Sequence, residues 1–232
     1  MSGAVIDPAA AVRVLRQGRE KQPVVVIDGA LADPDAWRQV AARAHFAAIR
    51  PFHPGVSAAV PARLAAQLRD ELAPLIGDAF APDPLPPASG CYLSLVTTLP
   101  EDLAPVQRLP HVDGLERARI AVLVYLSGAE QGGTGFFRQR ATGFETVDQG
   151  RSAAFQAALE AGLAEHGPPP PGYLHDDTAL YEMIALHEAR PNRALVYRSH
   201  TLHSAAIPPG APLPDDAATG RLTLNLFLSV AA

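Results

Sequence analysis

The sequence predicts a mainly β protein with flanking helices, of the α+β class. In the first third of the chain, apolar residues recur at helical spacing, as in Leu64, Leu68, Leu72 and Leu75. From Val106 onward, short apolar runs are separated by Gly, Pro, Asn and Asp, a pattern typical of an antiparallel barrel or sandwich. With 232 residues, of which 48% are hydrophobic and 19% charged, the chain is expected to form a single domain, 1–232.

Residues 1–90 are expected to supply one strand and helices that pack on one face of the later sheet. Asp33 followed by Pro34 predicts a helix start, because an acidic N-cap and a proline at the first helical position both favour it. The apolar stripes of these helices are typical of packing surfaces. The expected elements are a weak helix at 8–20, a strand at 23–29, a helix from 33 to about 46, a loop at 50–60 and a helix from about 61 to 76.

Residues 91–232 are expected to form the β-core. One alanine-rich stretch, at about 151–166, predicts a helix inserted between strands, and Pro168 to Pro171 makes a stiff exit from it. The expected strands are 91–97, 119–126, 180–186, 194–198, one ending at 204 and one from 221 to 230, with turns at 132–135 and 190–193.

Composition excludes several kinds of partner. The chain has 24 acidic and 19 basic residues, a net charge of −5, and no Lys/Arg cluster, which argues against nucleic acid and anionic membranes. The only cysteine, Cys91, cannot form an internal disulfide, as expected in a reducing compartment. No signal-peptide core and no long apolar run is present, so we expect a cytoplasmic protein.

A candidate metal site begins at His111 and Asp113. On an extended segment these two side chains point the same way and could grip one ion. A second histidine downstream would complete a set of two imidazoles and one carboxylate, which leaves half of an octahedral ferrous ion open to other ligands. His200 and His203 both qualify, and the residues alone do not choose between them. The alternative is a turn after Pro110 in which Asp113 caps a loop.

Several short segments carry a resemblance to a known family. They are Val24–Leu31, Leu109–Asp113, Ala121–Ser127, Gly132–Phe136, Leu202–Ser204 and Arg221–Thr223. Together they resemble the core of Fe(II)/2-oxoglutarate-dependent oxygenases, and most closely the prolyl 4-hydroxylase-like branch, over about residues 23 to 229. The resemblance implies a double-stranded β-helix, a jelly-roll or cupin-like barrel, that holds Fe(II) near its open end and uses 2-oxoglutarate as cosubstrate.

The resemblance also implies roles for individual residues. It makes His111, Asp113 and His203 the catalytic metal ligands, and leaves His200 as a neighbour of the site or a neutral strand residue. Arg221 matches the basic residue that pairs with the far carboxylate of 2-oxoglutarate, a pairing for which a guanidinium fork is well shaped.

Two further residues are candidates for holding the cosubstrate. Thr223 shares a strand face with Arg221 by alternation and could offer its hydroxyl to the same carboxylate. Tyr125 matches a tyrosine that reaches the cosubstrate in some members, although a buried phenol needs a partner in any case and a structural role is equally open. The proline-rich connection 208–216 is longer than in most relatives and is either a lid or a surface excursion.

The activity implied is hydroxylation of a small molecule or peptidyl side chain, with succinate and CO2 as co-products. Arg138 and Arg140, expected near the pocket, are candidates for binding an anionic group of that substrate. Two other classes stay open. A non-catalytic jelly-roll binding module would keep the strands without needing the ligand set. A zinc hydrolase on the same ligands would need a general-base glutamate and would have no use for Arg221.

Overall fold

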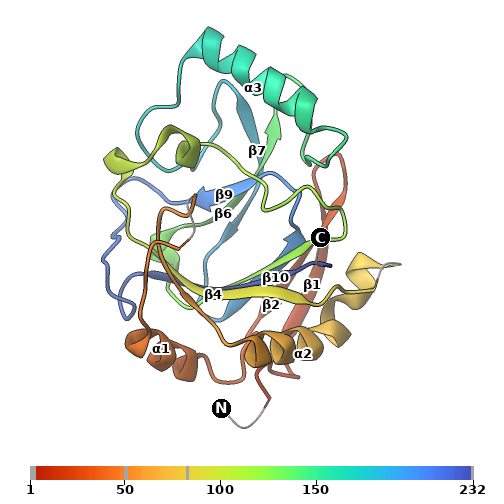
Figure 1. The fold of residues 1–232 in the computed structure, drawn as a ribbon, viewed down its shortest axis with the longest axis vertical. Coiled ribbons are helices and arrows are strands. Elements are labelled where there is room, and N and C mark those ends of the chain that lie inside the picture. The colour runs from red at the N-terminus through yellow and green to blue at the C-terminus, as the bar shows by residue number, and fades with distance from the viewer. Residues whose placement is uncertain (1–3, 50–51, 82–83, 231–232) are drawn as a thin grey trace.

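Two antiparallel sheets account for most of the structure (Figure 1). The computed structural model describes residues 4–49, 52–81 and 84–230. The larger sheet has the order β1-β2-β8-β5-β10-β4-β3, and the smaller has the order β7-β6-β9. The strands of the larger sheet are β1 (Ala11–Gln17), β2 (Gln22–Asp28), β3 (Gly55–Ala59), β4 (Ala88–Val96), β5 (Ile120–Tyr125), β8 (Arg193–Arg198) and β10 (Arg221–Leu228). Those of the smaller sheet are β6 (Gly133–Gln139), β7 (Tyr181–Glu188) and β9 (His203–Ala206).

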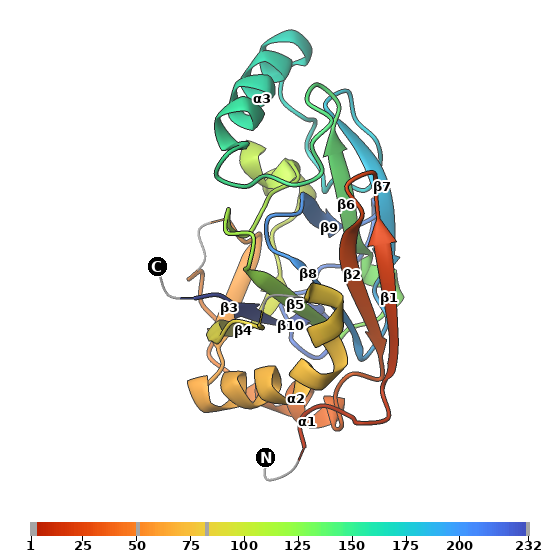
Figure 2. The ribbon, with the colours of Figure 1, turned by 90° about the vertical axis from the view of Figure 1, so that its right-hand side faces the viewer.

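The three α-helices among the described residues lie at the two ends of the molecule. Helices α1 (Pro34–Arg43) and α2 (Ala62–Phe80) lie together at one end, against the larger sheet. Helix α3 (Ser152–His166) lies at the opposite end, beyond the smaller sheet (Figure 2). Short 3-10 turns occur at Pro100–Asp102, Pro105–Arg108 and Ala129–Gln131. No helix among the described residues is long and apolar enough to cross a membrane.

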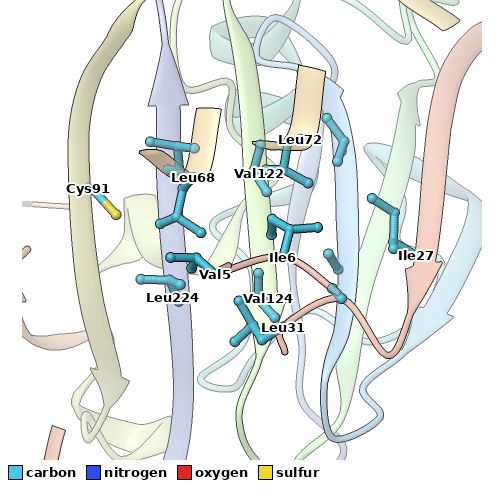
Figure 3. Packing of buried hydrophobic residues seen from close by; sticks show 14 of the residues in the cluster. Val5, Ile6, Ile27, Leu31, Leu68, Leu72, Cys91, Val122, Val124 and Leu224 are labelled. Atoms are coloured by element: carbon cyan, nitrogen blue, oxygen red, sulfur yellow. The ribbon is translucent and has the colours of Figure 1, made fainter. Parts of the chain in front are cut away.

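The main core lies between α2 and the outer face of the larger sheet. Leu68 and Leu72 of α2 belong to one buried cluster with Val122, Val124 and Leu224 of the central strands (Figure 3). A second cluster fills the space between the two sheets and includes aromatic residues from both, so the central strands are buried on both faces. Burial of this apolar surface supplies the main stabilisation of the sheet pair.

The helices predicted from residue 33 and from about residue 61, and the inserted helix, are confirmed. Asp33 caps α1, and its carboxylate accepts the Ala36 amide at 2.9 Å with Pro34 at the start of the helix. Helix α1 ends at Arg43, slightly earlier than expected, whereas α2 continues past Ile76 to Phe80. Helix α3 occupies the alanine-rich insertion.

Two expectations about the N-terminal part were wrong. The weak helical pattern at 8–20 corresponds to strand β1, which pairs with β2 from Ala11 opposite Asp28 to Gln17 opposite Gln22. Gly18, where φ is +67°, begins the hairpin turn between the two strands. The loop expected at 50–60 contains β3, which pairs with β4; residues 50 and 51 lie outside the described residues. In both cases pairing with a neighbouring strand overrode the local signal.

Strand β10 connects the core to the site. Its even-numbered leucines belong to the cluster under α2, while Arg221, Thr223 and Asn225 face the other way. The predicted alternation along this strand is therefore confirmed. The expected turn at 132–135 is shorter than predicted, because Gly133 already begins β6.

Candidate metal centre

His111 and His203 lie side by side because their backbones pair. The His111 amide donates to the His203 carbonyl at 2.9 Å, and the His203 amide donates to the His111 carbonyl at 3.0 Å. The centres of the two imidazole rings lie 4.4 Å apart. The pairing joins the segment before β5 to the first residue of β9, so two histidines far apart in the sequence meet.

Asp113 completes the cluster on the same extended segment. Its amide donates to the Ser199 carbonyl at 2.8 Å, which holds the segment against the chain leading into β9. Its two carboxylate oxygens lie 3.9 Å from His111 Nε2 and 3.4 Å from His203 Nε2. Adjacent ligands about 2.1 Å from one metal ion are about 3 Å apart, so small side-chain shifts would let the three share an ion.

The hydrogen bonding of His203 orients it for such a role. Its Nδ1 lies 2.9 Å from the Thr201 carbonyl oxygen, which can only accept a hydrogen bond. Nδ1 therefore carries a proton, and Nε2 faces Asp113 and His111, where its lone pair could be offered to an ion. The side chains of His203 and Asp113 are 7% and 10% exposed, whereas that of His111 is 54% exposed, so the cluster opens to solvent on the His111 side.

The structure separates His200 from this cluster. His200 lies in the turn before β9, not on a strand, and the Val147 amide donates to its carbonyl at 2.8 Å. Its imidazole lines a different cavity, with Glu20 and Arg151. Burial, reinforced by the nearby Arg198 guanidinium, lowers the pKa of His200 to about 4. Of the two histidines left open by the residues, only His203 is placed to join His111 and Asp113.

A cavity of about 480 Å³ lies next to the cluster. This volume falls within the range of small-molecule sites. Five predicted site residues line it: His111, Asp113, His203, Arg221 and Thr223. Among the described lining residues, Asp113 is the only acid and Arg221 the only arginine or lysine.

Arg221 is a buried cation without a carboxylate partner among the described residues. It is 4% exposed, and its Nε and one terminal nitrogen donate to the carbonyls of Gln131 and Gly133 at 3.1 and 2.9 Å. Its guanidinium carbon also lies 5.9 Å from the centre of the Tyr125 ring. Burial lowers the pKa of Arg221, but a guanidinium stays charged in proteins. A buried positive charge is costly unless an anion compensates it.

The glycine-rich turn that anchors Arg221 also brings β6 close to β9. At Gly132, where φ is +85°, an added Cβ would lie 2.1 Å from the Ala206 carbonyl oxygen. A larger residue would therefore push apart the turn that holds Arg221 and the strand that carries His203.

Thr223 and Tyr125, the other predicted cosubstrate residues, differ in position. Thr223 lines the cavity, and its hydroxyl accepts a hydrogen bond from Asn225 at 3.0 Å. Tyr125 is fully buried and does not line the cavity; its hydroxyl bonds to that of Thr134 at 2.5 Å. Desolvation raises the pKa of Tyr125. Tyr125 therefore contacts Arg221 without reaching the cavity that Arg221 lines.

The expectation that Arg138 and Arg140 lie near this pocket was wrong. Arg138 is 6% exposed and forms ion pairs with Glu145 and, at 2.7 Å, with Glu182. Arg140 pairs with Asp177 at 2.7 Å on the surface. Neither arginine lines the cavity beside the cluster. Arg138 and Arg140 each pair with an acid distant in sequence, Glu182 and Asp177 respectively, which residue patterns could not reveal.

Sequence reasoning missed other lining residues. Tyr197 of β8 lines the cavity, and its ring centre lies 4.9 Å from that of His203. Asn225 of β10 follows Thr223 on the same face, so the alternation that singled out Thr223 could have found it. Tyr173, which also lines the cavity, donates its hydroxyl to the Thr98 carbonyl and comes from the loop after α3, where no pattern marked it.

Comparison with protein families places the chain. A family model, DUF6445, described as a family of unknown function, matches residues 8–228. The chain belongs to the DUF6445 family. The part of this DUF6445 protein that matches includes the His111, Asp113 and His203 cluster and Arg221. No curated protein is similar enough in sequence to match.

Several solved structures are weakly similar to this DUF6445 protein. The non-heme alpha-ketoglutarate-dependent epimerase SnoN from nogalamycin biosynthesis is 16% identical, with a TM-score of 0.49 over 93% of this chain and 79% of that one. HygX from Streptomyces hygroscopicus, with nickel and 2-oxoglutarate bound, is 15% identical, with a TM-score of 0.49 over 89% and 82%. An N-substituted L-amino acid dioxygenase from Burkholderia ambifaria AMMD is 14% identical, with a TM-score of 0.46 over 94% of both chains.

Proposed function

We propose that this protein is an Fe(II)- and 2-oxoglutarate-dependent dioxygenase that hydroxylates a small molecule or a peptidyl side chain. The observation that carries the proposal is one cavity lined by both a cluster of two histidines and one aspartate and a buried arginine without a carboxylate partner among the described residues. The pairing of the two sheets is proposed to be a double-stranded β-helix. Within these oxygenases, we propose that the chain is related most closely to the prolyl 4-hydroxylase-like branch.

The donor set fits the proposed metal. Two imidazoles and a carboxylate on one side of an ion are the ligand set of non-heme Fe(II) oxygenases, and they leave the other side open. The Thr201 carbonyl holds the proton of His203 on Nδ1, so Nε2 is available. His111, Asp113 and His203 would hold the ion, whose redox chemistry with dioxygen supplies the oxidising power when it is bound.

Arg221 fits a dicarboxylate cosubstrate. Its Nε and one terminal nitrogen are tied to carbonyls, which leaves the other terminal nitrogen without a described partner beside the cavity. A carboxylate there would compensate the buried charge. Thr223, on the same strand face, would add a hydroxyl contact. These residues would orient the cosubstrate, and their burial would keep water from the far carboxylate.

The lining of the cavity favours this proposal over a zinc hydrolase. A hydrolase on the same ligands needs a carboxylate near the metal to act as general base. No glutamate is among the described lining residues, and Asp113 is already a ligand candidate. A non-catalytic binding module remains the alternative, and the buried charge of Arg221 would then serve another anion.

The deciding experiment is an anaerobic titration of the metal-free protein with Fe(II) and then 2-oxoglutarate. Chelation of the keto acid by ferrous iron gives a weak visible charge-transfer band, which we expect in the wild-type protein. We expect the band to be lost in His203→Ala and retained in His200→Ala, because His200 lines a different cavity. The absence of both the band and a metal-linked rise in melting temperature in the wild-type protein would reject the proposal in favour of the binding module.

A further inference from the structure

We propose that the substrate is an uncharged, largely apolar molecule that places a hydroxyl or amide N–H on the side-chain carbonyl of Asn225. That this molecule is a substrate rests on the function proposed above. The inference itself comes from the part of the cavity that the metal ligands and Arg221 do not occupy.

Charge is scarce in this part of the cavity. Asp113 and Arg221 are the only carboxylate and the only guanidinium or ammonium group among its described lining residues, and both already have proposed roles. A substrate ammonium or second carboxylate would therefore be desolvated without a charged partner, which is strongly unfavourable. Arg119 lies nearby, with its guanidinium carbon 5.5 Å from the centre of the Phe227 ring, but it does not line the cavity.

The remaining surface is mainly apolar. Phe227, Ala121 and Leu123 of the larger sheet form the floor beyond Thr223. Two large apolar residues of the lining, Ile49 and Phe52, are 50% and 71% exposed, an unusual exposure for such side chains. Exposed apolar groups that border a cavity are typical of ligand-binding surfaces. The body of a bound molecule would cover this surface.

The inner face of β10 changes in character along its length. Arg221, Thr223, Asn225 and Phe227 follow one another on the cavity side, from a cation to an aromatic ring. Alternate residues of a strand are about 6.6 Å apart, so Asn225 lies about 13 Å along the strand from Arg221. Asn225 therefore lies where a cosubstrate held by Arg221 would give way to the substrate.

The hydrogen bonds of Asn225 fix which end of its amide is available. The Thr223 hydroxyl has a single hydrogen, which can point to the Ser94 carbonyl, at 3.5 Å, or to a cosubstrate carboxylate beside Arg221, and in both cases the hydroxyl accepts from its other neighbour. That neighbour is the Asn225 amide nitrogen, at 3.0 Å. Asn225 Oδ1 consequently has no donor among the described residues while the side chain lines the cavity. A substrate hydroxyl or N–H would satisfy it.

Three probes with one apolar body test this inference: 2-naphthol, 2-methoxynaphthalene and 2-naphthoate. Their affinities are measured by calorimetry on Zn(II)-loaded protein saturated with 2-oxoglutarate, so that Arg221 is already occupied. We expect 2-naphthol to bind about tenfold more tightly than either of the other two, because only it combines a donor with zero charge. Equal or tighter binding of 2-naphthoate would overturn the inference, and this ranking requires no variant to fold.

A variant locates the donor contact. Asn225→Leu should remove the preference for 2-naphthol over 2-methoxynaphthalene, whereas Gln156→Leu, on the exposed surface of α3, should retain it. Retention of the preference in folded Asn225→Leu would also overturn the inference.

The failure of this inference is separable from that of the proposed function. The preference for 2-naphthol over 2-methoxynaphthalene is also measured in protein free of metal and 2-oxoglutarate. If that preference appears but the chelate band does not, the proposed function is rejected, and the inference that the cavity binds an uncharged donor molecule at Asn225 is retained. If the band appears without the preference, only this inference fails.

Discussion

The backbones of His111 and His203 are joined by a reciprocal pair of hydrogen bonds, 2.9 and 3.0 Å long. The positions of both Cα atoms are therefore set by main-chain pairing and not by the imidazoles. Because of this, either side chain can be removed with little effect on the pairing, and the loss of a ligand can be measured in a folded protein.

Removal of a cluster side chain should abolish tight metal binding. We expect His111→Ala and Asp113→Asn to weaken Fe(II) affinity by about 100-fold or more, since each removes one of three proposed ligands. The measurement is the rise in melting temperature with added Fe(II) under anaerobic conditions. His166→Ala, at an exposed position in α3, is the control and should keep the full rise. A full rise in Asp113→Asn would remove Asp113 from the ligand set.

Replacement of Arg221 should weaken binding of the cosubstrate and leave binding of the metal unchanged. We expect Arg221→Gln to weaken 2-oxoglutarate binding by about 100-fold, because a charge-assisted contact in a buried site is lost. Fe(II) affinity should be unchanged. Isothermal titration of the Zn(II)-loaded protein gives the affinity, with the surface variant Arg140→Gln as control. Equal 2-oxoglutarate affinity in Arg221→Gln and wild type would contradict the assignment.

Tyr125 and Thr134 should be coupled in stability. Their hydroxyls are 2.5 Å apart and buried, so Tyr125→Phe leaves the Thr134 hydroxyl without this partner. We expect each of Tyr125→Phe and Thr134→Val to lower the free energy of unfolding by about 1–2 kcal/mol, and the double variant to lower it by less than the sum. Urea denaturation of the wild type, the two single variants and the double variant measures the coupling energy. Strictly additive losses in unfolding free energy would exclude this coupling. The same Tyr125→Phe protein tests whether the phenol contributes to 2-oxoglutarate affinity.

Substitution of Arg138 should destabilise the protein much more than substitution of Arg140, although the two residues lie only two positions apart. Arg138→Ala removes the charged partner of the buried Glu145 carboxylate, which keeps the amides of Arg19 and Glu20, and should cost about 3 kcal/mol of unfolding free energy. Arg140→Ala breaks an exposed pair with Asp177 and should cost less than about 1 kcal/mol. Chemical denaturation distinguishes these values. Similar costs for both variants would show that the Arg138 pair contributes no more than a surface pair.

His200 should make the protein sensitive to acid. Its pKa is lowered to about 4 by burial in the folded state, from an ordinary value of 6.5. Between these values the unfolded chain binds the proton and the folded one does not, so stability falls as the pH decreases from about 6.5 to about 4. The full effect is on the order of 3 kcal/mol.

The test for His200 is the pH dependence of the urea midpoint in the metal-free protein. His200→Phe should flatten the decline between pH 6.5 and 4 that wild type shows, whatever its effect on stability at neutral pH. His166→Ala provides the matched control, since His166 is an exposed histidine of α3. An unchanged slope in His200→Phe would assign the acid sensitivity to other groups.

Local patterns in the sequence determined a large part of this protein. The N-cap of α1, the inserted helix α3 and the two faces of β10 follow from short-range rules of capping and alternation. The spacing of His111 and Asp113 likewise defined two members of the cluster, because two residues on an extended segment share a face.

Only the tertiary structure decided which groups meet. The choice of His203 over His200 depends on the pairing of His203 with His111 and on a turn that directs His200 into a separate cavity. The ion pair of Arg138 with Glu182, and the strand character of β1 and β3, also depend on pairing with other segments. Such contacts are set by which segments the fold brings together, and neither hydrophobic period nor residue spacing encodes them locally.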